Sequence, residues 1–360
     1  MKDNESLNLE FYRGKRVFLT GHNGFKGSWL SKILINSGAI LTGYSLESPL
    51  EQSLLQMCNL ESKMTSIIGD VRDFDNLLRH FQIAKPEIVF HLAAQPIVRD
   101  SYRNPVFTYE TNVMGTVNIM ECVRLSDCVK SVVNVTTDKV YQNMEWDWGY
   151  RENDVLNGYD PYSNSKSCSE LVTSSYKQSF LNEAHIAVST ARAGNVIGGG
   201  DFAMDRIIPD CVKAAQNKEP VIVRNPNSTR PFQHVLDPLF AYLLIAREQY
   251  CEIGNSECYN IGPEDIDCIT TGQLVDLFIR SWGDNMSWKN ISDGGPHEAN
   301  FLKLDCSKMK NKFNWAPVWN VEMAVRKTVE WAKTHLANED VSQCMDRQIS
   351  EFILKSNKIE

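Results

Sequence analysis

The chain has 360 residues, and its 37 lysines and arginines face 45 acids, for a net charge of -8. This acidic balance argues against a nucleic-acid partner, and the apolar stretches are too short to span a membrane. The ten cysteines include no Cys-x-x-Cys pair, and the charged N-terminus, residues 1–5, lacks a signal core. We therefore expect a reduced, cytoplasmic protein with no metal site, long enough for one large α/β unit and a smaller lobe.

The first predicted elements enclose a glycine-rich loop. Residues 16–20 have the apolar, β-branched composition of a buried strand, and residues 28–38 have the apolar spacing and terminal glycine of a helix. Glycines in such a turn let the backbone approach a pyrophosphate at the helix N-terminus, although three glycines also occur in ordinary turns. The candidate contacts to a dinucleotide are Gly21, Asn23, Gly24, Phe25, Lys26 and Gly27.

The next predicted strand, residues 40–46, ends where an acid binds the adenosine ribose of NAD. Glu47 is the nearest candidate, and Ser45 could occupy the position instead. No arginine follows to meet a 2′-phosphate, so the sequence favours NAD over NADP. A later predicted strand, residues 88–95, ends in small residues that allow a cofactor to approach the backbone.

Two short motifs indicate proton-transfer chemistry. Tyr162 and Lys166 are four residues apart on a predicted helix and share one face, although an exposed helical pair would look the same. At ~4 Å and an effective dielectric of ~20, an ammonium stabilises a phenolate by about 4 kcal/mol, which favours a base that takes a proton from an alcohol. Thr137, Asp138 and Lys139 follow an apolar, strand-like run. The Asp-Lys pair exceeds what alcohol oxidation requires and indicates a second proton transfer, the loss of water.

With these motifs, nearly the whole chain resembles the CDP-glucose 4,6-dehydratases, in the extended branch of the short-chain dehydrogenase/reductase superfamily. The Gly-x-x-Gly-x-x-Gly spacing is that superfamily's variant of the dinucleotide fingerprint. The segments that carry the resemblance are 21–29, 137–139, 148–153, 159–163, 192–201 and 296–299. The resemblance implies an α/β fold with a Rossmann-type doubly wound parallel sheet and a smaller, discontinuous C-terminal substrate-binding lobe.

The same resemblance sets the expected domains. We expect an NAD-binding domain at residues 1–190 plus about 235–262, and a nucleotide-sugar-binding domain at about 191–234 plus 263–345. Residues 346–360 are expected to form a C-terminal tail. A homodimer or homotetramer is expected.

The activity implied is the NAD-dependent dehydration of CDP-glucose, or a related nucleotide sugar, in deoxysugar biosynthesis for lipopolysaccharide O-antigen. Tyr162, assisted by Lys166 and hydrogen-bonded through Thr137, would deprotonate the sugar 4-hydroxyl while hydride passes to NAD. Water would then leave across C5 and C6 with Asp138 as the acid, and hydride would return to C6 to give CDP-4-keto-6-deoxyglucose. Relatives that act on dTDP-glucose have Glu in place of Lys139, so Lys139 would either remove the ring proton or orient the carboxylate.

The resemblance also adds binding residues. Asp70 would face the adenine amino group, and Asn112 would fix the geometry behind the active site. The further cofactor candidates are Val71, Ala93, Ala94 and Gln95. The substrate candidates, whose arginines would clamp the diphosphate by paired hydrogen bonds, are Tyr141, Asn195, Arg206, Arg224, Arg230, His234 and His297.

Three alternatives remain at this point. A nucleotide-sugar 4-epimerase of the same fold needs the tyrosine and lysine but no Asp-Lys pair. A 4,6-dehydratase could act on another nucleotide sugar, because the sequence does not prove that the base is cytosine. A cofactor-sensing or scaffold protein could keep the fold without turnover, and an activity assay separates it from the enzymes.

Overall fold

The computed structural model describes residues 8–48, 52–283, 286–291 and 301–358. These residues form two compact units. The first unit contains the described residues up to Gln142 together with Glu152–Arg192 and Leu239–Asn260. The second contains Asn143–Arg151, Ala193–Pro238 and the described residues from Ile261 onward.

The first unit is built on a seven-stranded sheet in the order β11-β6-β5-β4-β1-β2-β3. Its strands are β1 (Arg16–Thr20), β2 (Ile40–Ser45), β3 (Thr65–Ile68), β4 (Ile88–His91), β5 (Ser131–Val135), β6 (Ala187–Ala193) and β11 (Cys258–Ile261). Every pairing from β3 through to β6 is parallel. The strand order reverses between β1 and β4, and doubly wound sheets bind ligands beyond the strand ends at such a point. The predicted Rossmann-type fold is confirmed.

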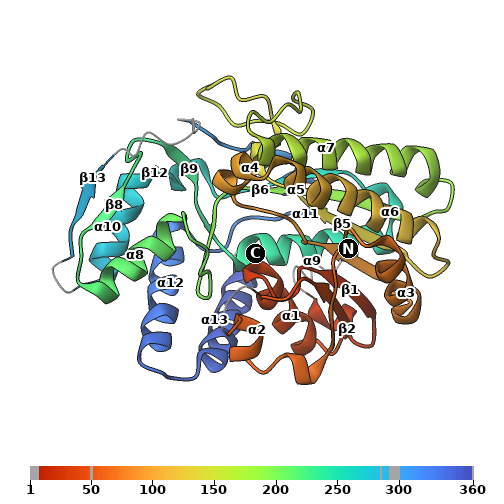
Figure 1. Ribbon diagram of the computed structural model, residues 1–360, viewed down its shortest axis with the longest axis horizontal. Helices are drawn as coiled ribbons and strands as arrows, with labels where there is room; N and C mark the ends of the chain where they lie inside the picture. Colours follow the sequence, from red (N-terminus) through yellow and green to blue (C-terminus); the bar gives the residue numbers. More distant parts are fainter. Residues whose placement is uncertain (1–7, 49–51, 284–285, 292–300, 359–360) are drawn as a thin grey trace. The chain divides into compact units, whose positions relative to one another are not determined.

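Helices cover both faces of this sheet (Figure 1). The helices are α1 (Phe25–Asn36) and α9 (Leu236–Cys251) on one face, and α3 (Phe74–Ala84), α6 (Gly115–Arg124) and α7 (Pro161–Tyr176) on the other. Shorter helices are α2 (Leu54–Met57), α4 (Val98–Arg103), α5 (Pro105–Tyr109) and the π-helical segment η3 (Glu110–Met114). Apolar side chains of α3 and α6, such as Leu77, Phe81 and Ile119, are buried with Phe18 and Val132 of the sheet. This apolar core packs α3 and α6 against the sheet.

The second unit has its own apolar core, formed by α8 (Ile207–Asn217), α10 (Thr271–Trp282) and α12 (Val321–Leu336) with buried residues such as Cys211 and Val221. Its strands form three separate pairs. They are β7 (Val196–Ile197) with β10 (Gln233–His234), β9 (Thr229–Pro231) with β12 (Cys268–Thr270), and β8 (Val221–Val223) with β13 (Trp288–Asn290). The last helices are α11 (Ser307–Phe313) and α13 (Val341–Ser356).

Two predicted boundaries differ from the structure. Residues 346–360 were expected as a tail, but α13 runs through Ser356 and packs on the second unit, where the Gln348 side chain donates to Lys327 O at 2.9 Å. The predicted 1–190 segment also includes residues 143–151, which belong to the second unit. Tyr150 explains this, because its backbone exchanges hydrogen bonds with Lys303 and Asp305.

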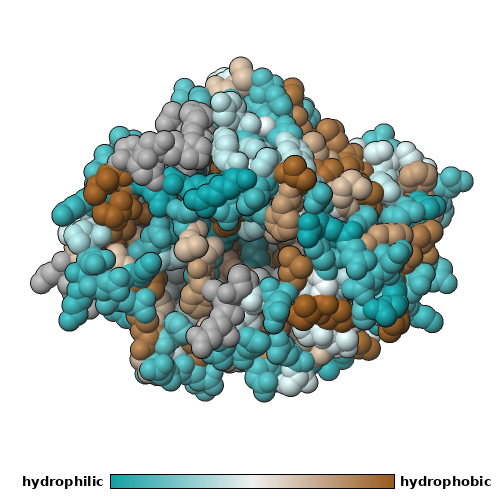
Figure 2. Space-filling model, in the orientation of Figure 1, coloured by the Kyte–Doolittle hydropathy of each residue, from teal (hydrophilic) through white to brown (hydrophobic). Residues whose placement is uncertain are grey.

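The visible surface is largely polar. On the face shown in Figure 2, hydrophilic residues predominate and apolar residues form separate patches. Within the part of the chain that the structure describes, no helix combines the length and apolar character needed to cross a membrane.

Candidate active site

The glycine loop between β1 and α1 is shaped by contacts that only glycine permits. Gly21 has a φ of +74°, and a Cβ there would lie 2.9 Å from the backbone nitrogen of Ala93. A Cβ at Gly27 would lie 2.0 Å from the Gly21 carbonyl oxygen. Helix α1 begins directly after Gly24, and no side chain of the described residues caps its first turn. The loop therefore fits a dinucleotide pyrophosphate, which binds to the N–H groups of a helix N-terminus.

Side chains of the loop tie it to neighbouring elements. The Asn23 side chain donates to Leu46 O at 2.6 Å, and Lys26 Nζ donates to the hydroxyl of Tyr242 on α9 at 3.3 Å. His22 is buried, and its Nε2 lies 2.7 Å from Ser66 Oγ. Burial lowers the pKa of His22 to about 4, so this ring is neutral and supports the loop.

The predicted adenosine contacts lie beyond β2 and β3. Ser45 is buried at the end of β2, and Glu47 is exposed two residues later. Asp70 accepts hydrogen bonds from Arg72, including one from Nη2 at 2.6 Å. Burial acts to raise the pKa of Asp70, but the contacts with Arg72 outweigh it and lower the pKa, so this carboxylate stays ionised. Val71 is buried. The roles of these residues toward a cofactor stay predictions.

The segment after β4 is held by two polar side chains. Thr20 Oγ1 accepts hydrogen bonds from the backbone N–H groups of Leu92 and Ala93, both at 3.1 Å. Asn112 exchanges hydrogen bonds with the backbone of Gln95 at 2.8 and 3.1 Å and donates to Ser165 Oγ on α7 at 2.9 Å. Asn112 therefore links the segment after β4 to the helix that carries the tyrosine and lysine.

The Thr-Asp-Lys motif forms a short turn after β5. Residues Asp138–Val140 make a 3₁₀ helix, η4, with Thr137 at its N-cap. Thr137 Oγ1 donates to Asp138 Oδ1 at 3.0 Å and accepts from the Lys139 backbone N–H at 3.4 Å. Asp138 is only 2% exposed, and Lys139 is half-buried. The structure thus gives the predicted acid a fixed orientation.

Helix α7 brings the predicted base to the same turn. Asp160 caps this helix by accepting from Ser163 N at 2.9 Å, and Pro161 starts it. Lys166 is buried, and its Nζ donates to the carbonyl of Val135, the last residue of β5, at 3.1 Å. Burial lowers the pKa of Lys166 to about 8, against the opposing effect of Glu170. Tyr162 lies one helical turn before Lys166 and is half-buried.

Two predicted substrate residues lie inside the protein. The Tyr141 hydroxyl donates to Asn260 Oδ1 at 2.6 Å and accepts from Arg192 at 2.8 Å, and burial raises its pKa. His234 is fully buried against Trp319, with the ring centroids 4.7 Å apart. Burial, with the Lys327 charge, lowers the pKa of His234 to about 3, so its ring is neutral. Neither side chain presents its polar group on an open surface. The sequence pattern did not predict this burial.

The other substrate candidates belong to the second unit. Arg206 pairs with Asp201 and Arg224 with Asp205, each at 2.9 Å. Arg230 is buried on β9 and donates to the Thr229 carbonyl at 2.9 Å. The Asn195 carbonyl accepts from the backbone of Gln233 at 3.0 Å. His297 lies outside the described residues.

Sequence reasoning missed Glu170 and Arg192 as site residues. They form an ion pair at 2.9 Å directly behind the turn and are each 2% exposed at the side chain. One signal was present, because Glu170 follows Lys166 by four residues and so shares its helical face.

Comparison with known proteins agrees with this geometry. The sequence profile of the GDP-mannose 4,6 dehydratase family matches residues 18–328. The chain is 49% identical to the CDP-glucose 4,6-dehydratase of Salmonella typhimurium, over 96% of this chain and 98% of the relative. It is 24% identical to the CDP-paratose 2-epimerase of Salmonella typhi, over 89% of this chain and 99% of that protein.

Solved structures show the same fold at lower identity. The dTDP-glucose 4,6-dehydratase of Bacillus anthracis, in complex with NAD, superposes with a TM-score of 0.76 at 20% identity and covers 91% of this chain and 100% of its own. The UDP-glucose 4-epimerase of Thermus thermophilus, also in complex with NAD, has a TM-score of 0.78 at 22% identity, with 88% and 99% covered. The predicted resemblance is confirmed: this chain belongs to the GDP-mannose 4,6 dehydratase family, in the nucleotide-sugar dehydratase branch of the extended short-chain dehydrogenases/reductases.

Proposed function

We propose that this protein is an NAD-dependent hydro-lyase that converts CDP-glucose to CDP-4-keto-6-deoxyglucose. The observation that carries the proposal is the presence of two proton-transfer groups at one place in the first unit. Tyr162 and Lys166 come from α7, Thr137 and Asp138 come from the turn after β5, and the Lys166–Val135 hydrogen bond joins the two. The 49% identical Salmonella typhimurium relative supports CDP-glucose as the substrate.

The glycine loop supports NAD as the cofactor, because close backbone contacts at Gly21 and Gly27 make the tight turn that a dinucleotide pyrophosphate requires before a helix N-terminus. When bound, NAD supplies the hydride acceptor for sugar C4 and the hydride donor for C6. The chain's part is to hold the pyrophosphate at the start of α1 and to keep the segment after β4 in place through Thr20 and Asn112.

The first proton transfer belongs to Tyr162. Its phenolate oxygen takes the proton of the sugar 4-hydroxyl and becomes a hydroxyl, and the Lys166 ammonium one turn away stabilises the phenolate beforehand. With a pKa of about 8, Lys166 is mainly protonated at neutral pH. Its hydrogen bond to Val135 O fixes the ammonium beside residues 137–140, which we call the catalytic turn.

The second proton transfer belongs to the turn. A ketone at C4 acidifies the proton on C5, and Asp138 gives a proton to the departing 6-hydroxyl. The hydrogen bond from Thr137 Oγ1 to Asp138 Oδ1 orients the carboxyl group that carries this proton. Lys139 either takes the C5 proton as a neutral amine or orients the carboxylate while another basic group takes that proton.

The proposal extends to a cytoplasmic homodimer or homotetramer whose product enters deoxysugar biosynthesis for lipopolysaccharide O-antigen. All ten cysteines are free, which suits a reducing compartment. Light scattering on the purified protein tests the oligomer, and a monomeric mass contradicts it.

Isotope transfer tests the reaction. With CDP-glucose deuterated at C4, the deuterium should appear at C6 of the keto-deoxy product, with no stoichiometric NADH in solution. Deuterium retained at C4 would identify an epimerase, and stoichiometric free NADH would identify a dehydrogenase.

A substrate panel tests the base. CDP-, dTDP-, GDP- and UDP-glucose are compared by kcat/KM for keto-sugar formation. The CDP sugar should lead, and a higher value for another nucleotide would move the assignment to that sugar.

A further inference from the structure

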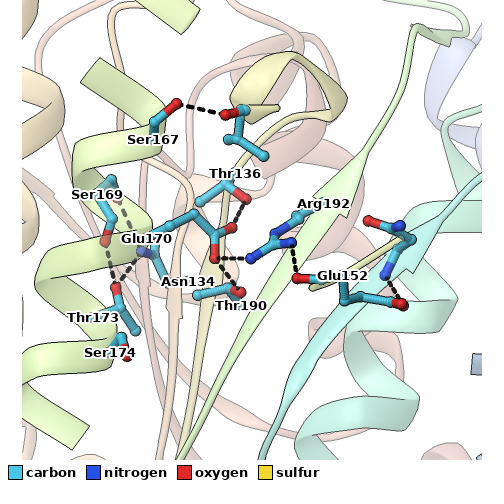
Figure 3. A network of polar contacts seen from close by, with 12 residues as sticks. Asn134, Thr136, Glu152, Ser167, Ser169, Glu170, Thr173, Ser174, Thr190 and Arg192 are labelled. Carbon is cyan, nitrogen blue, oxygen red and sulfur yellow. Dashed lines mark hydrogen bonds and ion pairs between the residues drawn. The ribbon is translucent and has the colours of Figure 1, made fainter. Parts of the chain in front are cut away.

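A buried ion pair lies behind the catalytic turn. Glu170 on α7 and Arg192 on β6 are bonded at 2.9 Å, and each side chain is 2% exposed. Figure 3 shows the Glu170 carboxylate between Thr136 and Arg192, with Thr190 beside it. Glu170 Oε1 accepts from Thr136 Oγ1, and Oε2 accepts from Thr190 Oγ1 at 2.6 Å.

The ion pair is not explained by stability alone. Removing two charges from water has a cost that their attraction often only balances, and apolar residues of similar volume are frequently as stable. The hydrogen bonds of the pair to other residues therefore indicate a further role. Arg192 Nη1 donates to the Tyr141 hydroxyl at 2.8 Å and to the Glu152 carbonyl at 2.9 Å.

The two partners hold the two ends of the catalytic turn. Thr136, bound by Glu170, directly precedes Thr137, and Tyr141, bound by Arg192, directly follows η4. Between these ends lie the predicted acid and its hydrogen-bonding threonine. A third bond, from Ser167 Oγ on α7 to the Val140 carbonyl at 2.7 Å, also fixes the turn (Figure 3).

Glu170 also acts on the lysine. Lys166 is the residue one helical turn before it, and the Glu170 charge raises the pKa of Lys166 against the effect of burial. Tyr162 lies one helical turn before Lys166 on α7, and His91 on β4 is close enough to be affected by the Lys166 charge. Burial, followed by the Lys166 charge, lowers the pKa of His91 to about 3, so His91 is neutral. Arg192 on β6 and Tyr141 face Glu170 itself.

We propose that Glu170 and Arg192 are positioning residues of the dehydration reaction. Through Thr136 and Tyr141 they fix both ends of the turn that holds Asp138, and Glu170 places a negative charge one helical turn from Lys166. Neither residue touches the substrate. The inference rests on the proposed function, because it assigns the pair to the two proton transfers of that reaction.

Thr136→Val tests the turn. This variant removes one hydrogen bond to Glu170, changes little volume and leaves the ion pair intact. The kcat for CDP-glucose should fall about tenfold or more while KM changes little, because small displacements of catalytic groups are costly. Thr190→Val is the matched control: it removes the other threonine bond to the same carboxylate, from β6 rather than from the turn, and should keep a near-parental kcat.

Glu170→Gln tests the charge. Without the carboxylate, Lys166 should lose its proton at lower pH, so the basic limb of the kcat/KM profile should move to lower pH. The Tyr162 phenolate should then form at higher pH, because it lacks the neighbouring ammonium. Its absorbance near 295 nm is read as the difference between each protein and the same protein with Tyr162→Phe. Glu170→Asp, which keeps the charge, should restore both titrations.

The outcomes separate this inference from the proposed function. If the parental protein does not convert CDP-glucose, the proposed function is wrong, while the phenolate titration still tests Glu170 without any sugar. If the parental protein is active but Thr136→Val keeps the parental kcat, the inference about the turn is overturned. That variant leaves no buried charge unpaired, so it decides the matter even if Glu170→Gln does not fold. Unchanged titrations in a folded Glu170→Gln protein overturn the role assigned to the charge.

Discussion

At the scale of single residues, Lys166 joins the two parts of the proposed chemistry. It shares a helical face with Tyr162, and its Nζ binds the carbonyl of Val135, two residues before Thr137. Burial favours the neutral amine, and Glu170 favours the ammonium, so the pKa falls to about 8 rather than further. The ammonium that the phenolate needs is thus present at neutral pH and is lost as the pH rises above 8.

Substitutions of Tyr162 and Asp138 should separate oxidation from elimination. Tyr162→Phe removes the oxidation base and should lower all steps by about 10²–10⁴-fold. Asp138→Asn cannot protonate the leaving hydroxyl but keeps an oxygen that accepts from Thr137. Reduced cofactor, followed at 340 nm in a single turnover, should therefore accumulate only with Asp138→Asn.

The control for the tyrosine is Tyr176→Phe, at the other end of α7, whose hydroxyl contacts Glu121 at 3.3 Å. It should retain parental turnover. Equal loss of cofactor reduction in Tyr162→Phe and Asp138→Asn would show that Asp138 does not act in the elimination alone.

At the scale of elements, the sequence could predict what depends on neighbours along the chain. The strand predicted at residues 16–20 has the bounds of β1. The helix predicted at 28–38 is α1, which runs from Phe25 to Asn36 and begins directly after Gly24, the last residue in an extended conformation. Glycine spacing and strand composition are local signals. The Thr-Asp-Lys turn and the Tyr-Lys helix face are local in the same sense.

What the sequence could not predict depends on distant partners. Glu170 and Arg192 are 22 residues apart on a helix and a strand, and neither shows its partner in the sequence. Tyr141 and His234 were expected to meet substrate, but packing buries both. The C-terminal residues looked like a tail because the contact of Phe352 with Trp319, at 5.2 Å between ring centroids, joins distant segments.

The loop between β1 and α1 should not tolerate a single added methyl group. In Gly27→Ala, the new Cβ would lie 2.0 Å from the Gly21 carbonyl, far inside van der Waals contact, so the start of α1 must shift. NAD affinity, measured by calorimetry, should fall at least tenfold, and the free energy of unfolding should fall by about 1–3 kcal/mol.

Gly254→Ala is the control, because its Cβ would lie 3.7 Å from its nearest neighbour, an ordinary contact. This variant should bind NAD like the parental protein. Unchanged affinity in Gly27→Ala would mean that the pyrophosphate binds elsewhere.

At the scale of the whole molecule, the predicted proton-transfer residues and most of the predicted substrate residues belong to different units. The proposed proton-transfer groups lie in the first unit, whereas Asn195, Arg206, Arg224 and Arg230 belong to the second. The second unit also contains a buried carboxyl group, Asp237, whose Oδ1 accepts from the backbone N–H of Val318 at 2.7 Å. The pH dependence of folding should therefore have a source separate from the catalytic groups.

Asp237 should make the protein less stable as the pH rises towards neutrality. Burial raises the pKa of Asp237 to about 7, against backbone hydrogen bonds from Val318 and Trp319. The unfolded chain releases this proton near pH 4, so between about pH 4 and 7 the folded state binds more protons, and its free energy of unfolding falls with rising pH. Asp237→Asn does not titrate and keeps an oxygen for Val318.

Urea unfolding of the parental and Asp237→Asn proteins at pH 5, 6.5 and 8 checks this expectation. The variant should gain stability over the parent as the pH rises, by up to about 4 kcal/mol at pH 8. Asp305→Asn is the control whose effect should not change over this pH range. Burial acts to raise the pKa of Asp305, but Ser307 and Arg151 lower it below its usual range, so the Asp305 carboxylate is ionised in the folded and the unfolded protein above about pH 4. Its replacement should therefore reduce stability by the same amount at pH 5, 6.5 and 8. A pH-independent difference between Asp237→Asn and the parent would show that Asp237 is ionised throughout, and that solvent or a cation reaches this carboxylate in the folded protein.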